Sequence, residues 1–199
     1  MPFFHNTLTE IVNFVFLPIR VLCPDSLVER TRLRTLETER IRICLKFATG
    51  FVLDVGCGKN NRLVTEYGHG IGVDVSVWPT IDVLCDTEKM PFNDASFDTV
   101  TLLASLNYIP RKQNVLREVR RVLKRDGIVL VTMISPFVGF LHHRIFRLWN
   151  FKRQKEIGQT EVGLSRKRVQ HLFSECGIEY KQTIPFVYGL NTLHVGSCR

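Results

Sequence analysis

The apolar run at residues 51–55, followed at once by Gly56-Cys57-Gly58, constrains the fold of this chain more than any other feature. Its pattern favours a strand that is buried on both faces, as in a parallel sheet. Glycines at two alternate positions supply a tight turn, and they remove the side chains that would hold a ligand away from the main chain. The stretch therefore predicts a parallel strand whose carboxyl end meets a ligand.

A second apolar strand strengthens this prediction. Ile71-Gly72-Val73-Asp74-Val75 ends in an acid about 20 residues beyond the first strand, where a carboxylate can accept hydrogen bonds from both hydroxyls of a ribose. A third glycine of the dinucleotide fingerprint would fall at Asn61, and no G-x-x-x-x-G-K-[ST] phosphate cradle is present. The two strands thus predict a nucleoside site at the carboxyl edge of an open α/β sheet, without the usual pyrophosphate signature.

Three further stretches carry a family resemblance. Residues 83–100 combine an acid, Met90-Pro91-Phe92, Ser96-Phe97-Asp98 and a strand, residues 116–127 form a basic helix and a glycine turn, and residues 163–178 form another helix. Together with the glycine turn, they resemble the class I S-adenosylmethionine (SAM)-dependent methyltransferases of the type 11 group, which includes quinone and sterol methyltransferases. The resemblance covers residues 51–135 and 160–195. It implies a Rossmann-like α/β fold: a mostly parallel seven-stranded sheet with an antiparallel last strand and helices on both faces.

One domain is expected over residues 1–199, because no linker or repeat divides the chain. It comprises an N-terminal lid and helix (1–48), a cofactor-binding half (49–134), a substrate-cover insertion (135–164), and a C-terminal helix and hairpin (165–199). A single helix is predicted from Pro24 to about Phe47, with a mixed charged face of the kind that is usually solvated. The helices after Gly58 and after Asp74 are expected to be short or absent.

The apolar segment Ile11–Leu22 has two interpretations. It is shorter than the ~20 residues that a membrane-spanning helix needs, and it lacks the basic start of a signal peptide. It can pack as a lid over the site, or it can lie on a membrane surface.

The resemblance also implies a set of cofactor contacts. Asp54 corresponds to the acid that engages the methionine ammonium, Asp74 to the ribose acid and Asp86 to the acceptor for the adenine amine. Each has a structural alternative: tying of loop amides for Asp54, a helix cap for Asp74 and a turn cap for Asp86. The complete set of predicted cofactor-binding residues is Asp54, Gly56, Cys57, Gly58, Asp74, Val75, Asp86, Thr87, Glu88 and Ala104.

Three residues are candidates for contact with the methyl acceptor. Tyr108 stands where many relatives carry a histidine, and it can either orient an acceptor or simply pack. His142 and His143 lie in the insertion and have imidazoles that titrate near neutrality, so either can act as a general base or hold structure. Methyl transfer itself is an in-line displacement that needs alignment of the acceptor and exclusion of water.

The charge balance leaves the acceptor open. Lys and Arg number 27 against 19 Asp and Glu, a net charge of +8 that favours an anionic partner. A small-molecule or lipid-like acceptor is the first interpretation. RNA, protein as acceptor, and an inactive methyltransferase-like partner protein are the alternatives. Six scattered cysteines favour a reducing compartment and no metal site, so a cytoplasmic location is expected, with peripheral membrane contact as a second interpretation.

Overall fold

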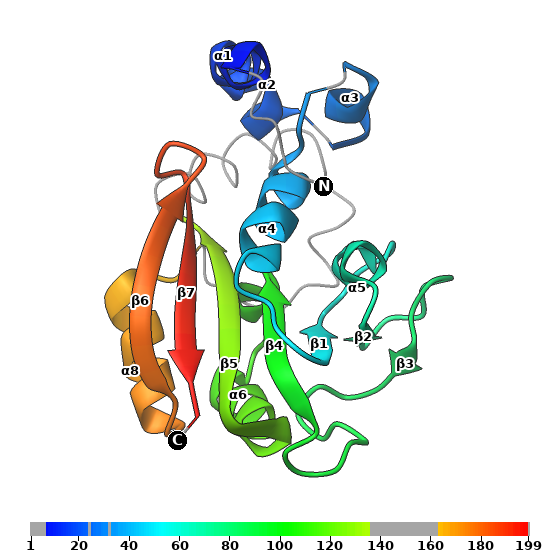
Figure 1. Cartoon of the computed structure of the whole chain (residues 1–199), viewed down its shortest axis with the longest axis vertical. Helices are drawn as coiled ribbons and strands as arrows, with labels where there is room; N and C mark the ends of the chain where they lie inside the picture. The colour runs from blue at the N-terminus through cyan, green and yellow to red at the C-terminus, as the bar shows by residue number, and fades with distance from the viewer. Residues whose placement is uncertain (1–6, 24, 32, 136–162, 199) are drawn as a thin grey trace.

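A seven-stranded sheet forms the centre of the computed structural model, which describes residues 7–23, 25–31, 33–135 and 163–198 (Figure 1). The strand order is β3-β2-β1-β4-β5-β7-β6. The first five strands run parallel, β7 runs antiparallel to both β5 and β6, and this confirms the predicted Rossmann-like α/β fold. The strands are β1 (Val52–Val55), β2 (Gly70–Asp74), β3 (Val83–Leu84), β4 (Phe97–Leu103), β5 (Leu123–Ile134), β6 (Glu179–Phe186) and β7 (Asn191–Ser197).

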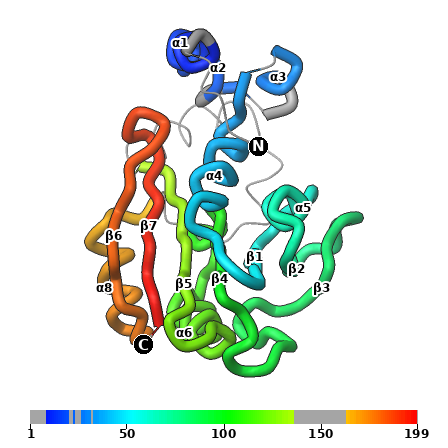
Figure 2. The backbone as a smooth tube through the Cα atoms, in the orientation of Figure 1, coloured from blue at the N-terminus to red at the C-terminus, as the bar shows by residue number. Residues whose placement is uncertain are grey.

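Helices cover both faces of the sheet (Figure 2). On one side lie α4 (Leu36–Leu45) and α5 (Arg62–Tyr67), and on the other lie α6 (Lys112–Val122) and α8 (Arg166–Glu175). Alternate strand residues serve the two faces, because side chains along a strand point in opposite directions. Val52 and Leu130 pack with Ile41 of α4, whereas Leu53 and Val131 belong to the core under α6 and α8.

The connections around β2 are short, as the sequence predicted. Helix α5 has six residues, and residues 75–82 contain no helix. Asn61 adopts a left-handed conformation (φ 44°), and its amide donates to the Asp82 carboxylate at 2.8 Å. A Cβ atom at Gly72 would lie 2.1 Å from the Asn61 side-chain oxygen. The Asn61 side chain therefore occupies the position of the third fingerprint glycine, and Gly72 on β2 leaves the space for it.

The predicted single helix over residues 24–47 is wrong. The structure has two helices, α3 (Asp25–Arg30) and α4, and Thr35 begins the second by accepting a hydrogen bond from the Thr38 amide at 3.1 Å. Threonine is a favourable N-cap residue because its hydroxyl satisfies an amide that the helix leaves unpaired. The cap thus starts a new helix within a sequence whose charges and apolar residues continue without a break.

The apolar segment forms α1 (Thr7–Val15) and α2 (Leu17–Leu22), joined to α4 by a buried arginine. Arg20 is 2% exposed and donates to the Asn13 carbonyl, the Arg34 carbonyl and the Glu39 carboxylate, the last at 2.8 Å. Several large apolar side chains of this segment nevertheless remain exposed: Ile11, Phe14, Val15, Phe16 and Ile19. Among the described residues, no helix is long and apolar enough to cross a membrane.

Replacing Arg20 with alanine is expected to detach α1 and α2 from α4. Removing one partner of a buried ion pair leaves unsatisfied polar groups, and such losses cost about 3–5 kcal/mol. Limited proteolysis should then cleave the first 30 residues at least about tenfold faster, while the sheet unfolds at nearly the same temperature. Arg30→Ala, at an exposed position on α3, is the control. Equal proteolysis rates for the two variants would show that Arg20 does not hold the segment.

Candidate functional site

A pocket of about 570 Å³ opens at the carboxyl end of β1. Asp54 and the turn Gly56-Cys57-Gly58 line it from the sheet side, and Leu103 lines it from the end of β4. Its volume lies within the range of about 300–1,000 Å³ that is typical of small-molecule sites. The structure thus brings four of the predicted cofactor-binding residues into one cavity.

The glycine turn presents a bare backbone surface to this pocket. Gly56 (φ 76°) and Gly58 (φ 66°) both adopt the left-handed conformation, which favours glycine. A Cβ atom at Gly56 would lie 2.7 Å from the Ser105 Cβ, whereas one at Gly58 would meet no atom within 4 Å. Gly56 is therefore required for packing of the loop after β4, and Gly58 leaves space that a ligand can occupy.

The amides of the turn face β2. The Gly56 and Cys57 amides donate to the Val73 carbonyl at 2.8 and 3.1 Å, and the Gly58 amide donates to the Asp74 carboxylate at 3.0 Å. Because these three amides are already bonded to β2, they are not available to a ligand carboxylate. Such a carboxylate needs cationic side chains instead. Lys59 and Arg40 both line the pocket.

Gly58→Ala is expected to lower SAM affinity at least about tenfold, because the methyl group enters the pocket. Gly68→Ala is the matched control, since Gly68 also has a positive φ (82°) with no atom near its missing Cβ, but caps α5 away from the pocket. Both variants carry a similar backbone strain of about 1–2 kcal/mol. Calorimetric titration with SAM should separate them. Equal affinities would remove Gly58 from the cofactor surface.

Asp54 is a buried acid at the wall of the pocket. It is 1% exposed, and the Thr101 hydroxyl donates to its Oδ1 at 2.5 Å. Burial raises the pKa of Asp54 to about 7, the Thr101 hydrogen bond opposes this shift, and the carboxylates of Asp74 and Glu37 add to it. A bound ammonium would offset the cost of the buried charge, so the site favours a ligand that carries a cation here.

Asp74 ends β2 with both of its oxygens engaged. One accepts from the Gly58 amide, and the other accepts from the Ser76 amide at 2.9 Å. The loop-tying role that was the structural alternative for Asp54 thus belongs to Asp74. Each carboxylate oxygen has two lone-pair directions, so these bonds leave capacity for ribose hydroxyls.

Asp74 is not a lining residue of the pocket, although it bonds to the Gly58 amide, and the predicted adenine-side residues do not line the pocket either. Asp86 is exposed, and its Oδ1 accepts from the Glu88 amide at 2.9 Å, which is the turn-capping alternative. The Glu88 carboxylate binds Arg111 and Asn114, and Thr87 is buried. Ala104 is half-buried, with its amide bonded to Thr132, and Val75 is 65% exposed. These assignments stay predictions.

The acceptor-side candidates are also left without a position in the pocket. Tyr108 is 53% exposed in the short 3-10 helix η1 (Leu106–Tyr108), and it is not among the lining residues. His142 and His143, with most of the predicted insertion, lie outside the described residues.

Sequence reasoning missed the contribution of α4. Glu37, Arg40 and Ile41 line the pocket, although the charged face of this segment was expected to be solvated. Arg40 also donates to the buried Asn191 side chain at 3.3 Å, and Glu37 pairs with Arg62 at 3.0 Å. No signal in the sequence distinguishes these charges from their solvated neighbours, because only the packing of α4 over the carboxyl edge places them at the site.

The donor set fits the amino-acid end of SAM. Asp54 matches an ammonium, Lys59 and Arg40 match a carboxylate, and the open surface at Gly58 leaves room for the ligand backbone. The fit rests on residues from β1, its turn and α4, three elements that are brought together by the sheet.

Comparisons with known proteins show what the chain is similar to. A family model described as a methyltransferase domain matches residues 53–131. The chain is 31% identical over 156 residues to an uncharacterized protein of Methanocaldococcus jannaschii (72% of this chain, 60% of that protein). It is 28% identical over 212 residues to demethylmenaquinone methyltransferase of Bacillus cereus (86% and 88%). It is also 31% identical over 128 residues to the ubiquinone/menaquinone biosynthesis C-methyltransferase of Cupriavidus taiwanensis (57% and 52%).

Solved structures show the same fold. A SAM-dependent methyltransferase of Thermotoga maritima has a TM-score of 0.63 at 16% identity (82% of this chain, 89% of that one). A protein of Pyrococcus horikoshii has a TM-score of 0.60 at 24% identity (86% and 91%). The alignments span 60% of the archaeal relative and about half of the Cupriavidus enzyme. The chain thus carries a methyltransferase domain over residues 53–131, and its strand order, its glycine-turn pocket and these matches support a class I SAM-dependent methyltransferase of the type 11 group, with S-adenosylmethionine as cofactor.

Proposed function

We propose that the protein transfers the methyl group of SAM to a small, lipid-like acceptor by in-line displacement. The observation that carries this proposal is the pocket at the carboxyl end of β1, where Asp54 and the bare surface of Gly58 lie under α4. SAM supplies a methyl group already activated on a positively charged sulfur. The protein therefore mainly has to hold the cofactor, align the acceptor and exclude water.

The residues of the pocket, together with Asp74 beside the glycine turn, would divide these tasks. Asp54 would hold the methionine ammonium, and Lys59 and Arg40 would bind the carboxylate. Asp74 would accept hydrogen bonds from the ribose while it keeps the glycine turn closed through the Gly58 amide. Helix α4 would exclude water, since Ile41 packs in the core and also lines the pocket.

Two observations support a lipid-like acceptor. Two of the relatives are quinone methyltransferases by name. In addition, α1 and α2 lie beyond the carboxyl edge of the parallel strands (Figure 1), and both helices carry exposed apolar side chains. Phe14 of α1 packs edge-on against Tyr188 in the β6–β7 turn, with ring centroids 4.8 Å apart. An exposed apolar surface of this kind suits an acceptor with a hydrocarbon portion.

The test is incubation of the purified protein with methyl-labelled SAM and a cell extract, followed by separation into lipid, small-metabolite, RNA and protein fractions. Label is expected in the lipid fraction. An Asp74→Ala protein in the same extract controls for endogenous enzymes. Label confined to RNA or to protein would contradict the proposed acceptor, and absence of SAM binding would favour an inactive partner protein instead.

A further inference from the structure

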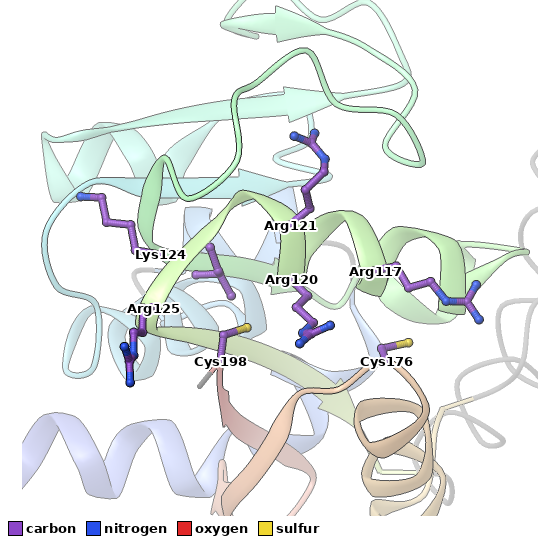
Figure 3. Close-up of a pocket in the computed structure, with 8 residues that line it drawn as sticks. Arg117, Arg120, Arg121, Lys124, Arg125, Cys176 and Cys198 are labelled. Carbon is purple, nitrogen blue, oxygen red and sulfur yellow. The ribbon is translucent and has the colours of Figure 1, made fainter.

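A second pocket, of about 800 Å³, lies at the other end of the sheet. Its walls include the last turns of α6, the first residues of β5, Cys176 after α8 and Cys198 after β7 (Figure 3). Leu123 begins β5, and the Asp126 amide donates to the Cys198 carbonyl at 2.9 Å. These are the amino end of a parallel strand and the carboxyl end of its antiparallel neighbour. The pocket is therefore separate from the cofactor site, which lies at the carboxyl ends of the parallel strands.

Five of the lining side chains are cations, and two of them are neutralised. Arg121 binds the carboxylates of Glu118 and Asp94, each at 2.8 Å, and Lys124 binds Asp98 at 2.9 Å. Figure 3 shows Arg121 and Lys124 pointing to the side of α6 away from Cys176 and Cys198. Arg121 holds α6 to the loop before β4, and Lys124 joins β5 to β4, so both residues are structural.

The other three cations are Arg117, Arg120 and Arg125. Within the described part of the chain, no carboxylate lies within ion-pair distance of any of them, and Arg117 instead donates to the Asn114 side chain at 3.1 Å. Arg120 points toward Cys176 and Cys198 (Figure 3). A Cβ atom at Gly177 would lie 3.1 Å from the Arg120 Cζ, so the Arg120 guanidinium packs against bare backbone. The negative end of the α6 dipole favours one or two cations in the last turn of the helix. It does not account for Arg125, which lies beyond the end of α6, or for the presence of a pocket.

Among the described residues, the other walls are Leu123, Cys176 and Cys198, which carry no carboxylate, and Glu175 precedes Cys176 on α8. Cys176 and Cys198 are buried, and burial raises the pKa of both thiols, so they stay neutral at physiological pH. The pocket is thus lined by three exposed guanidinium groups that have no carboxylate partner among the described residues, beside two neutral thiols. Guanidinium groups bind phosphate oxygens through paired, charge-assisted hydrogen bonds.

We propose that this basic pocket binds a small solute with two or more phosphate groups. The volume exceeds what a single phosphate needs and falls within the range of small-molecule sites. Nucleic acid is disfavoured because binding of single strands relies on exposed aromatic side chains beside the cations. The exposed large apolar residues of the described chain lie elsewhere, on α1 to α3, around β2 and β3, and at Tyr108 and Tyr188. This inference does not depend on the proposed function.

Calorimetric titration of the whole protein with sodium tripolyphosphate at about 0.15 M salt tests the proposal. Saturable one-to-one binding is expected. The triple variant Arg117→Gln, Arg120→Gln, Arg125→Gln should raise the dissociation constant at least about tenfold. The matched triple variant Arg30→Gln, Lys46→Gln, Lys167→Gln removes the same charge from exposed positions outside the pocket and should change it less than about twofold. Circular dichroism establishes that both variants are folded.

Three outcomes would overturn the proposal. One is the absence of saturable binding to the unaltered protein. Another is an equal loss in both triple variants, which would show unspecific attraction by net charge. The third is tighter binding of a single-stranded RNA oligonucleotide than of tripolyphosphate, lost in the pocket variant. Tripolyphosphate affinity should persist in Lys59→Gln, which removes a cation from the cofactor pocket alone, because a loss there would place the phosphates in that pocket.

Discussion

Asp74→Ala is expected to weaken SAM binding at least about 100-fold while the protein stays folded. A carboxylate that accepts from both ribose hydroxyls makes two hydrogen bonds to a charged group, each worth about 1.5–3 kcal/mol. The loss of the smaller value twice already gives a factor of about 100. Equilibrium binding by calorimetry measures the effect, and thermal unfolding establishes that the fold survives.

The same substitution also removes the acceptor for the Gly58 and Ser76 amides, so a second variant is needed. Asp74→Asn keeps one side-chain oxygen for the turn but loses the charge that strengthens the ribose bonds. It should bind SAM more weakly than the unaltered protein and more tightly than Asp74→Ala. Glu175→Ala, which removes a charge from α8 on the opposite face of the sheet, is the control and should bind normally. Retained affinity in Asp74→Ala would refute the assignment of the ribose acid.

Asp54→Asn is expected to stabilise the unliganded protein and to impair its binding of SAM. The folded pKa of Asp54 is about 7, above its ordinary value of 3.8. Between these pH values the folded state binds more protons than the unfolded state, so the free energy of unfolding falls as pH rises from about 4 to about 7 and is level above that. Asparagine does not titrate. The gain in unfolding temperature of Asp54→Asn over the unaltered protein should therefore be larger at pH 8 than at pH 5, with a free energy on the order of 1–4 kcal/mol.

The affinity for SAM should depend on pH in the opposite sense to the stability of the unliganded protein and rise as pH rises. Only the ionised Asp54 attracts an ammonium, so the affinity of the unaltered protein should rise about fivefold between pH 6 and pH 7, in proportion to the ionised fraction. Asp54→Asn should bind weakly, with no such dependence.

Thr101→Val offers an independent variant at the same site. Its loss of the hydrogen bond to Oδ1 raises the pKa of Asp54 further, which moves the midpoint of the affinity profile to higher pH. A flat profile in the unaltered protein, or an unchanged midpoint in Thr101→Val, would show that Asp54 does not meet the cofactor's cation.

The sheet could be predicted from local patterns because its strands correspond to short apolar runs in the sequence. Apolar runs at 51–55 and 71–75 and the glycines between them require buried parallel strands and a tight turn, whatever surrounds them. The pocket residues Asp54, Gly56, Cys57 and Gly58 follow from this, since the ends of parallel strands meet at one edge. The break between α3 and α4 could not be predicted in the same way, because a single capping threonine competes with a continuous helical pattern.

The sequence by itself determined the strands, the bare turn and the acids that end β1 and β2, because strand burial and glycine conformation are set by residues close together in the chain. Only the tertiary structure decided what faces those acids. Glu37 and Arg40 became pocket residues because α4 packs across the sheet, and Arg20 became a buried anchor because α1 and α2 fold back onto α4. Charged residues of the same type have different roles because distant segments of the chain contact them differently. A local sequence pattern does not contain those contacts.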